Sequence, residues 1–253
     1  MTMKYAIITG SSRGLGEAIA KRMLEEKVKV IGVARSENEE LKMLAKQLGG
    51  EYHFYPCNLA STTEIRSVFH EISDLTINEQ TEQVYLINNA GMIEPIETAG
   101  QLDDQAISTN VQVNLTAPIQ ISNLFLHKAK DSRTPLSIVN VTSGAAERPV
   151  HGWSLYCSTK AGINMFTKTT GLELENQQSQ IKVIGYSPGI MDTEMQSTIR
   201  SSSEEAFAEL DTFKDYKEKG MLRTPTVVAN ALVLLILEGK VDNGKIYYVN
   251  DLI

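Results

Sequence analysis

The chain has 253 residues, of which 42% are hydrophobic and 22% charged, with 17 glycines and only 7 prolines. This length suits one large domain, and the composition argues against disordered, collagen-like and long coiled-coil proteins. The 24 basic and 31 acidic side chains leave a net charge of −7, so we expect no nucleic-acid partner.

Short β-branched runs alternate with longer amphipathic segments along the whole chain. The predicted strands cover, in chain order, residues 5–8, 28–34, 52–57, 84–88, 137–141, 181–186 and 245–249. The predicted helices cover residues 14–26, 37–48, a segment that opens at the N-cap residue Ser61, about 104–130 and 154–174. This alternation predicts an α/β fold with a parallel sheet of about seven strands and helices on both faces.

One polar, irregular segment interrupts this alternation at about residues 190–223, directly after the sixth predicted strand. Ligands of open α/β sheets bind beyond the carboxyl ends of the strands, so we expect this segment to be a substrate lid. No flexible linker or internal repeat divides the chain. We therefore predict a single domain over residues 1–253 that carries this lid.

Metal, membrane and secretion signals are absent from the sequence. The two cysteines, Cys57 and Cys157, lie far apart, and the four histidines form no metal-binding pair, so we expect no metal. The first residues do not resemble a signal peptide, and the longest apolar stretch, 227–237, is too short to span a membrane. These features predict a cytoplasmic protein without a membrane partner.

The first predicted strand leads into Thr9-Gly-Ser-Ser-Arg-Gly-Leu-Gly16 and then into a helix. Its glycines allow a tight turn and a close backbone approach to a pyrophosphate, whose charge the helix N-terminus favours. A tight turn without a ligand is the alternative, but a strand before and a helix after the glycines are the context that dinucleotide binding requires.

Arg35 and Ser36 follow the second predicted strand, about 20 residues beyond the glycines. An acidic residue there would bind the ribose hydroxyls of NAD, whereas an arginine can bind the 2′-phosphate of NADPH. Arg13, inside the glycine-rich turn, could reach the same phosphate. The alternative is that both arginines are solvated surface residues; the missing acid favours NADPH.

Tyr156 and Lys160 lie four residues apart, on one face of a predicted helix. A phenol, with a pKa of about 10, exchanges protons poorly at neutral pH unless a nearby cation stabilises its phenolate, and Lys160 supplies one. Ser143 follows a buried strand and can hold a carbonyl oxygen. Alone, the Tyr156–Lys160 pair could be a solvated helix face.

The motifs TGxxxGxG (9–16), NNAG (88–91), Ser143, YxxxK (156–160) and SPG (187–189) together resemble the short-chain dehydrogenase/reductase family over essentially the whole chain. The resemblance implies a Rossmann-type doubly wound sheet, which agrees with the NADPH that Arg35 and Arg13 favour as cofactor. It implies Tyr156 as the general acid, Lys160 as the group that lowers its pKa, Ser143 as the carbonyl-orienting residue and Asn114 as the residue that holds a relay water.

The same resemblance implies a set of cofactor contacts. They are Gly10, Ser12, Arg13, Gly14, Leu15, Gly16, Arg35, Ser36, Asn58, Leu59, Asn89, Ala90, Gly91, Tyr156, Lys160, Pro188, Gly189, Ile190 and Thr193. Asn58 departs from the family, which commonly has an aspartate near the adenine there; an amide can still donate or accept, so binding changes only in detail.

Residues 188–196, PGIMDTEMQ, resemble the sepiapterin-reductase-like branch of the family, whose bacterial members include benzil reductases. This resemblance implies NADPH-dependent reduction of one carbonyl of a 1,2-diketone, such as benzil, to a chiral hydroxyketone. The candidate substrate residues, mostly apolar, are Ser143, Ala145, Trp153, Tyr156, Met191 and Met195. Trp153 and the methionines could instead be core residues.

Three alternatives stay open. The first is sepiapterin reduction, but the C-terminal tail of this chain has no recognisable pterin-binding acid and has Tyr248 near the expected position. A 3-oxoacyl thioester reductase would favour a basic surface that the charge of −7 does not suggest. A non-catalytic NADPH sensor on this fold would not need Ser143, Tyr156 and Lys160. Relatives pair through two long helices, so we expect a homodimer or homotetramer.

Overall fold

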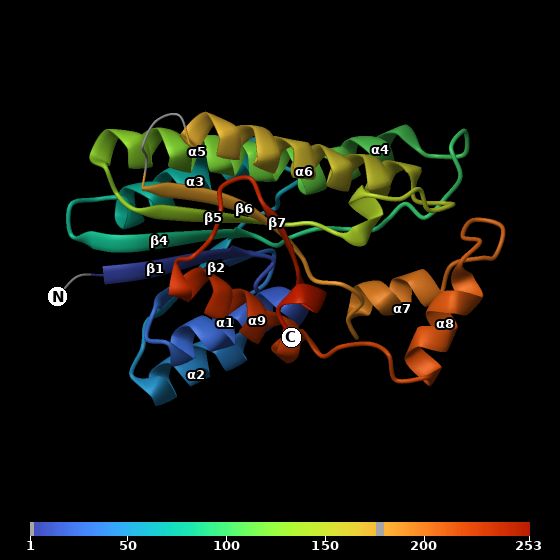
Figure 1. Cartoon of the computed structure of the whole chain (residues 1–253), viewed down its shortest axis with the longest axis horizontal. Helices are drawn as coiled ribbons and strands as arrows, with labels where there is room; N and C mark the ends of the chain where they lie inside the picture. The colour runs from blue at the N-terminus through green and yellow to red at the C-terminus, as the bar shows by residue number, and fades with distance from the viewer. Residues whose placement is uncertain (1–2, 176–179) are drawn as a thin grey trace.

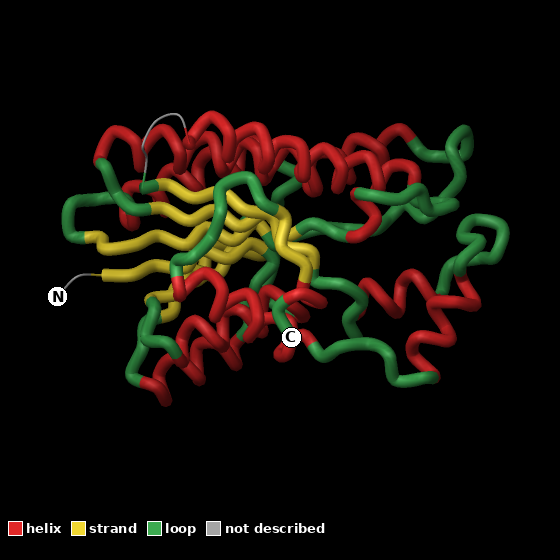
Figure 2. Tube along the Cα trace, in the orientation of Figure 1, coloured by secondary structure: helices red, strands yellow, loops and turns green. Residues whose placement is uncertain are grey.

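The computed structural model describes residues 3–175 and 180–253 and has one twisted sheet between two layers of helices (Figures 1 and 2). Its strands are β1 (Met3–Thr9), β2 (Lys29–Ala34), β3 (Tyr52–Pro56), β4 (Thr81–Asn88), β5 (Leu136–Val141), β6 (Ile181–Ser187) and β7 (Ile246–Tyr248). Neighbouring strands are parallel in the order β3-β2-β1-β4-β5-β6-β7. The predicted doubly wound parallel sheet of seven strands is confirmed.

Helices cover both faces of the sheet, as Figure 1 shows. One layer contains α1 (Gly14–Glu25), α2 (Glu39–Leu48) and α9 (Pro225–Glu238), and the other α3 (Thr62–Thr76), α5 (Ala117–Ser132) and α6 (Ser154–Glu175). Each layer encloses its own apolar core: Met23 and Leu41 are fully buried in the first, Phe69 and Phe125 in the second. Because both faces of the central strands are buried, those strands are almost continuously apolar, which is why the sequence shows them clearly.

Local capping explains where several helices begin. The hydroxyl of Ser61, the predicted N-cap, accepts a hydrogen bond from the backbone N–H of Glu64 at 3.3 Å. Asn38 caps α2 in the same way through Glu40, at 2.9 Å. Each cap satisfies a backbone donor that the first helical turn leaves unpaired.

The helix predicted over 104–130 contains a feature that the sequence did not reveal. The structure has α4 (Asp104–Val111), then a π-helical turn η1 (Gln112–Thr116), and then α5. A π turn inserts one extra residue into a helix and is frequent at functional sites. Here it contains Asn114, one of the candidate catalytic residues.

The segment 190–223 was expected to be irregular, but about half of it is helical. It contains α7 (Glu194–Arg200) and α8 (Leu210–Glu218), which lie together at one end of the molecule (Figure 1). Apolar side chains such as Phe207 and Phe213 are buried there, and this burial stabilises helices that the polar composition hid. An isolated β-bridge between Met191 and Arg223 closes the segment at its base.

Residues 3–175 and 180–253 contain neither a membrane-spanning helix nor a cluster of metal-binding side chains. None of the helices found there has the length and hydropathy needed to cross a bilayer. Within the same ranges, no cluster of three or more histidine, cysteine or acidic side chains could hold a metal ion.

Candidate active site

The glycine-rich turn between β1 and α1 is held from β4. The Asn89 amide donates hydrogen bonds to the backbone oxygens of Thr9 and Gly10, at 2.9 and 3.3 Å. The Thr9 hydroxyl accepts from the backbone N–H groups of Asn89 and Ala90, both at 3.0 Å. These bonds fix the turn in front of the α1 N-terminus, where backbone N–H groups favour an anion such as a pyrophosphate.

The turn has no room for a side chain at Gly16. A Cβ atom there would lie 2.2 Å from the Gly10 oxygen and 2.5 Å from the Asn89 amide nitrogen. Gly10 and Gly14 have positive φ angles, of 68° and 60°. The glycines that the sequence singled out are therefore required by the backbone, and their arrangement fits a dinucleotide.

We expect Gly16→Ala to destabilise the protein by about 1–3 kcal/mol and to weaken dinucleotide binding strongly, because the backbone of the turn must move. Thermal unfolding and a titration with NADPH measure the two effects. Gly50→Ala is the matched control, since a Cβ there meets only ordinary contacts of 3.7 and 3.8 Å. Similar behaviour of the two variants would contradict the role of Gly16.

The two arginines expected at the 2′-phosphate lie in different surroundings. Arg35 is exposed and lies directly after β2. Among the described residues it forms no ion pair with residues 190–223. Arg13 forms an ion pair with Glu194, the first residue of α7. Arg13 therefore already has an anionic partner, whereas Arg35 is the more accessible cation for a phosphate.

The other expected adenosine contacts lie around β3 and β4. Asn58 is exposed, and its amide oxygen accepts from the backbone N–H of Ala60 at 3.1 Å, so this oxygen already has a partner. Leu59 is buried in the core under α3 and α5. The glycine-rich turn also has a polar contact with Asn38, whose amide donates a hydrogen bond to the Ser12 backbone oxygen at 3.0 Å.

The segment that follows β6 also reaches the glycine-rich turn, although β6 is three strands away from β1 in the sheet. A Cβ atom at Gly14 would lie 3.7 Å from the Thr193 methyl group, so the glycine-rich turn and the start of α7 are neighbours. Pro188, Gly189 and Ile190 connect the end of β6 to this point. The expected cofactor residues from distant parts of the sequence thus converge on one region.

The catalytic candidates come from β5 and α6. The Lys160 ammonium lies 5.7 Å from the centre of the Tyr156 ring and donates a hydrogen bond to the Val141 backbone oxygen at 3.0 Å. Ser143, two residues after β5, lies near enough to the Tyr156 side chain to lower its pKa, and its hydroxyl accepts a hydrogen bond from the Ala145 backbone N–H at 3.2 Å. Tyr156 and Lys160 are both buried, so the pair is not a solvated helix face.

Burial changes the proton affinity of both candidate side chains. It raises the pKa of Tyr156 to about 12, an effect that Ser143 partly offsets. It lowers the pKa of Lys160 to about 8. The expected lowering of the phenol pKa by Lys160 is not found here: the loss of water around the phenol penalises the phenolate, and Ser143 is the neighbour that lowers the pKa.

Asn114 is held in the π turn by hydrogen bonds on both sides of its amide. Its oxygen accepts from the Met92 backbone N–H at 2.9 Å, and its nitrogen donates to the Met92 oxygen at 2.8 Å and to Asn110 at 2.9 Å. The side chain therefore clamps the segment after β4 against the helix; its role in holding a water stays a prediction.

Asn110 is a site residue that the sequence reasoning missed. It is fully buried, and its amide nitrogen donates to the backbone oxygens of Met92 and Glu94, at 3.3 and 2.6 Å. It lies one helical turn before Asn114, and an asparagine at that spacing on a mostly polar helix was the available signal.

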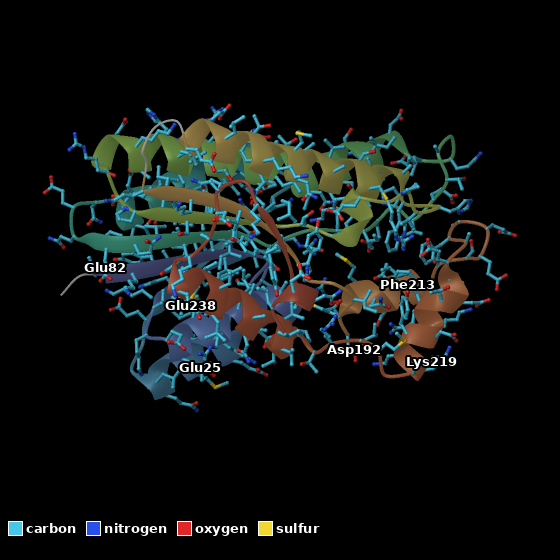
Figure 3. All side chains as sticks on the ribbon, viewed as in Figure 1. Glu25, Glu82, Asp192, Phe213, Lys219 and Glu238 are labelled. Atoms are coloured by element: carbon cyan, nitrogen blue, oxygen red, sulfur yellow. The ribbon has the colours of Figure 1, made fainter. Side chains whose placement is uncertain are left out.

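The candidate substrate residues divide between two places. Ala145, Trp153 and Tyr156 belong to one buried apolar cluster, and Met195 packs against it. Met191 instead packs on the core under α1 and α9, so it does not join them. Phe207 and Phe213, from the segment 190–223, also belong to this cluster and were not among the expected substrate residues (Phe213 is labelled in Figure 3).

The model of the short chain dehydrogenase family matches residues 4–204 of the chain. Two benzil reductases, described as forming (S)-benzoin, are similar over nearly their full length. The Bacillus cereus protein is 36% identical over 98% of this chain and 100% of its own, and the Bacillus subtilis protein 38% over 98% and 99%. Sepiapterin reductase of Bos taurus is 28% identical over 94% of this chain and 91% of its own.

Solved structures have the same fold. The KRED1-Pglu enzyme has a TM-score of 0.83 and 30% identity, over 97% of this chain and all of that one. Two proteins with 22% identity were solved with nicotinamide cofactors. A 3-oxoacyl-[acyl-carrier protein] reductase of Brucella melitensis in complex with NAD has a TM-score of 0.81 and covers 98% of this chain and 96% of its own. A short-chain dehydrogenase of Sphingobium yanoikuyae in complex with NADPH has a TM-score of 0.75 and covers 97% of this chain and 87% of its own.

Proposed function

The chain belongs to the short chain dehydrogenase family, and we propose that within it the protein is an NADPH-dependent reductase of 1,2-diketones. The family places it among oxidoreductases that act on alcohols and carbonyls and use nicotinamide dinucleotides. The observation that carries the finer proposal is the full-length similarity to two benzil reductases. Sepiapterin reductase is a less similar relative, which makes pterin reduction the second candidate.

In the proposed reaction, Tyr156 donates a proton to the carbonyl oxygen and Ser143 hydrogen-bonds the same oxygen. Bound NADPH supplies the hydride. The Lys160 ammonium stabilises the phenolate that remains on Tyr156, from a position 5.7 Å from the centre of its ring. Support for these roles comes from the burial of Tyr156 and Lys160, which strengthens their electrostatic coupling relative to water.

The apolar cluster around Ala145 and Trp153 supports an uncharged, aromatic substrate. In it the catalytic tyrosine lies at the edge of a set of ring side chains, and such a set favours another aromatic ring over a sugar or an acid. A 1,2-diketone with aryl groups meets this requirement. We propose α7 and α8 as the lid over it.

The direct test is NADPH oxidation with benzil as the substrate, with NADH in parallel and with chiral analysis of the product. We expect NADPH-dependent formation of one enantiomer of benzoin. Turnover of sepiapterin or of a 3-oxoacyl thioester, but not of benzil, would overturn the diketone proposal and keep the reductase. Binding of NADPH without turnover of any of these carbonyls would favour a sensor.

We expect kcat/KM for reduction, at saturating NADPH, to fall as the pH rises past about 8. Burial lowers the pKa of Lys160 to about 8, so the ammonium loses its charge there and no longer stabilises the phenolate. A pH–rate profile measures this limb. A profile that stays flat up to a pH of about 10 would contradict the role of Lys160.

We also propose that the protein forms a homodimer or homotetramer through α5 and α6. On α6, Met165 and Leu172 are 63% and 62% exposed, although both are large and apolar. Burying them against a second copy would remove this apolar surface from water. The mass in solution, from light scattering, distinguishes the monomer, dimer and tetramer.

A further inference from the structure

Four ring side chains form a continuous set of ring contacts between the lid and the catalytic helix; we call Trp153, Phe207, Phe213 and Tyr216 the lid cluster. Phe207 stacks face to face on Trp153, with ring centres 5.0 Å apart and planes 5° apart. Phe213 contacts both rings edge-on, at 5.4 Å from Trp153 and 5.2 Å from Phe207, and Tyr216 contacts Phe213 at 5.5 Å.

The lid cluster reaches the catalytic tyrosine directly. The Trp153 ring meets the Tyr156 ring edge-on, with centres 5.7 Å apart and an angle of 80° between the planes. Phe207 is fully buried, and Trp153, Phe213 and Tyr156 are 6%, 5% and 7% exposed. Phe207 lies 51 residues after Tyr156 (207 − 156) yet is only one ring away from it.

The backbone around the lid cluster is fixed as well. Gly152 has a φ angle of 81°, and a Cβ atom there would lie 1.9 Å from the Ala206 oxygen, so the lid chain packs directly on its backbone. Arg148 and Glu209 form two parallel hydrogen bonds, at 2.8 and 2.9 Å, across the same contact. This part of the lid is therefore bound to the segment that precedes the catalytic helix.

We propose that Phe207 and Phe213 are positioning residues, which hold the ring of Tyr156 in place through Trp153 and keep water away from it. This inference rests on the proposed function, in which Tyr156 donates the proton. Flat, buried rings have few alternative packings, so they restrain the ring that they contact. Small errors in the position of a reacting group reduce the rate strongly.

The two ends of the lid are attached to the rest of the protein in different ways. The 206–213 region is anchored to the catalytic segment by rings, by a close backbone contact and by the paired hydrogen bonds of Arg148. The α7 end is joined to the glycine-rich turn by the exposed ion pair of Arg13 and Glu194, whose side chains are 65% and 60% exposed. Exposed pairs contribute little to stability, and α7 is held mainly by Ile199, which is buried in the same apolar cluster as Phe207 and Phe213.

The test compares Phe213→Leu with Phe213→Tyr, and uses Phe207→Leu as a second probe. The leucine variants lose a flat ring, whereas tyrosine keeps it at a position that is 5% exposed. We expect the leucine variants to lower kcat for benzil reduction by about 10- to 100-fold, with a much smaller change in the KM for NADPH. We expect Phe213→Tyr, which keeps the ring, to have a kcat close to that of the wild type.

Trp153 is the only tryptophan of the chain, so its fluorescence reports on the lid cluster without any need for activity. We expect the leucine variants to increase quenching of this fluorescence by acrylamide several-fold, because water and quencher gain access. Phe125→Leu is the matched control: Phe125 is also fully buried, but on α5 in the other core. It should lower the melting temperature and leave both the quenching and the kcat at wild-type values.

Unchanged kcat and unchanged quenching in Phe207→Leu and Phe213→Leu would overturn the proposal. Losses of kcat equal to that of Phe125→Leu, at equal loss of stability, would also overturn it, because they would show a general packing effect. Failure of the proposed function looks different: the wild-type protein would then reduce no benzil. In that case quenching alone decides, and a quenching equal to that of the wild type in both leucine variants would overturn the sealing role.

Discussion

Replacing Tyr156 by phenylalanine should lower kcat for carbonyl reduction on the order of 10³-fold, because the variant has no proton to donate to the carbonyl oxygen. The ring itself is retained, so its edge contact with Trp153 at 5.7 Å should persist. The hydrogen bond from Lys160 to the Val141 oxygen does not involve the phenol and should also remain. Affinity for NADPH should therefore stay close to that of the wild type.

Steady-state kinetics with benzil and a binding titration with NADPH separate these two effects. Energy transfer from the single tryptophan, Trp153, to the bound nicotinamide offers a direct binding signal. Tyr85→Phe is the matched control, since Tyr85 is another tyrosine with only 5% exposure but lies on β4 in the core under α1 and α9. Equal loss of turnover and of NADPH binding in Tyr156→Phe would indicate misfolding and would contradict its role as proton donor.

Replacing Arg35 by aspartate should reverse much of the cofactor preference. A charge-assisted hydrogen bond contributes about 1.5–3 kcal/mol, so losing the bond to the 2′-phosphate should reduce kcat/KM with NADPH about 10- to 100-fold. The carboxylate should repel the phosphate further and can accept hydrogen bonds from the ribose hydroxyls of NADH. The preference ratio should change on the order of 10³-fold.

The ratio of kcat/KM with NADPH to that with NADH measures this change. Arg66→Asp is the control, because Arg66 is an exposed arginine on α3 and the substitution reverses the same charge there. An unchanged ratio in Arg35→Asp would assign the phosphate to another residue. Arg13 would be tested next, in a variant that also replaces its ion-pair partner Glu194.

Sequence patterns were informative where the relevant contacts are local. The apolar strands are continuous because both faces of the sheet are covered, and this reason applies to each strand separately. Gly10, Gly14 and Gly16 are required by the backbone of a single turn, so their spacing alone indicates it. Tyr156 and Lys160 lie on one face of α6 because a helix brings residues four apart together.

The polar composition of residues 190–223 was misleading because the contacts that stabilise this segment are not local. Helices α7 and α8 are stabilised by contacts with distant residues, such as that of Phe213 with Trp153, and not by their own propensity. The π turn around Asn114 has no clear local signal either. It is accompanied by hydrogen bonds from Asn110 and Asn114 to the segment after β4, which lies 16–22 residues earlier.

The sequence by itself determined the parallel sheet, the glycine-rich turn and the family, because each depends on short-range spacing that a single chain segment contains. Only the tertiary structure decided what surrounds the catalytic tyrosine. Burial, not Lys160, dominates the pKa of Tyr156, and its ring is held from the lid by Phe207 through Trp153. Desolvation and ring packing depend on which distant segments meet, and that is set by the folded chain as a whole.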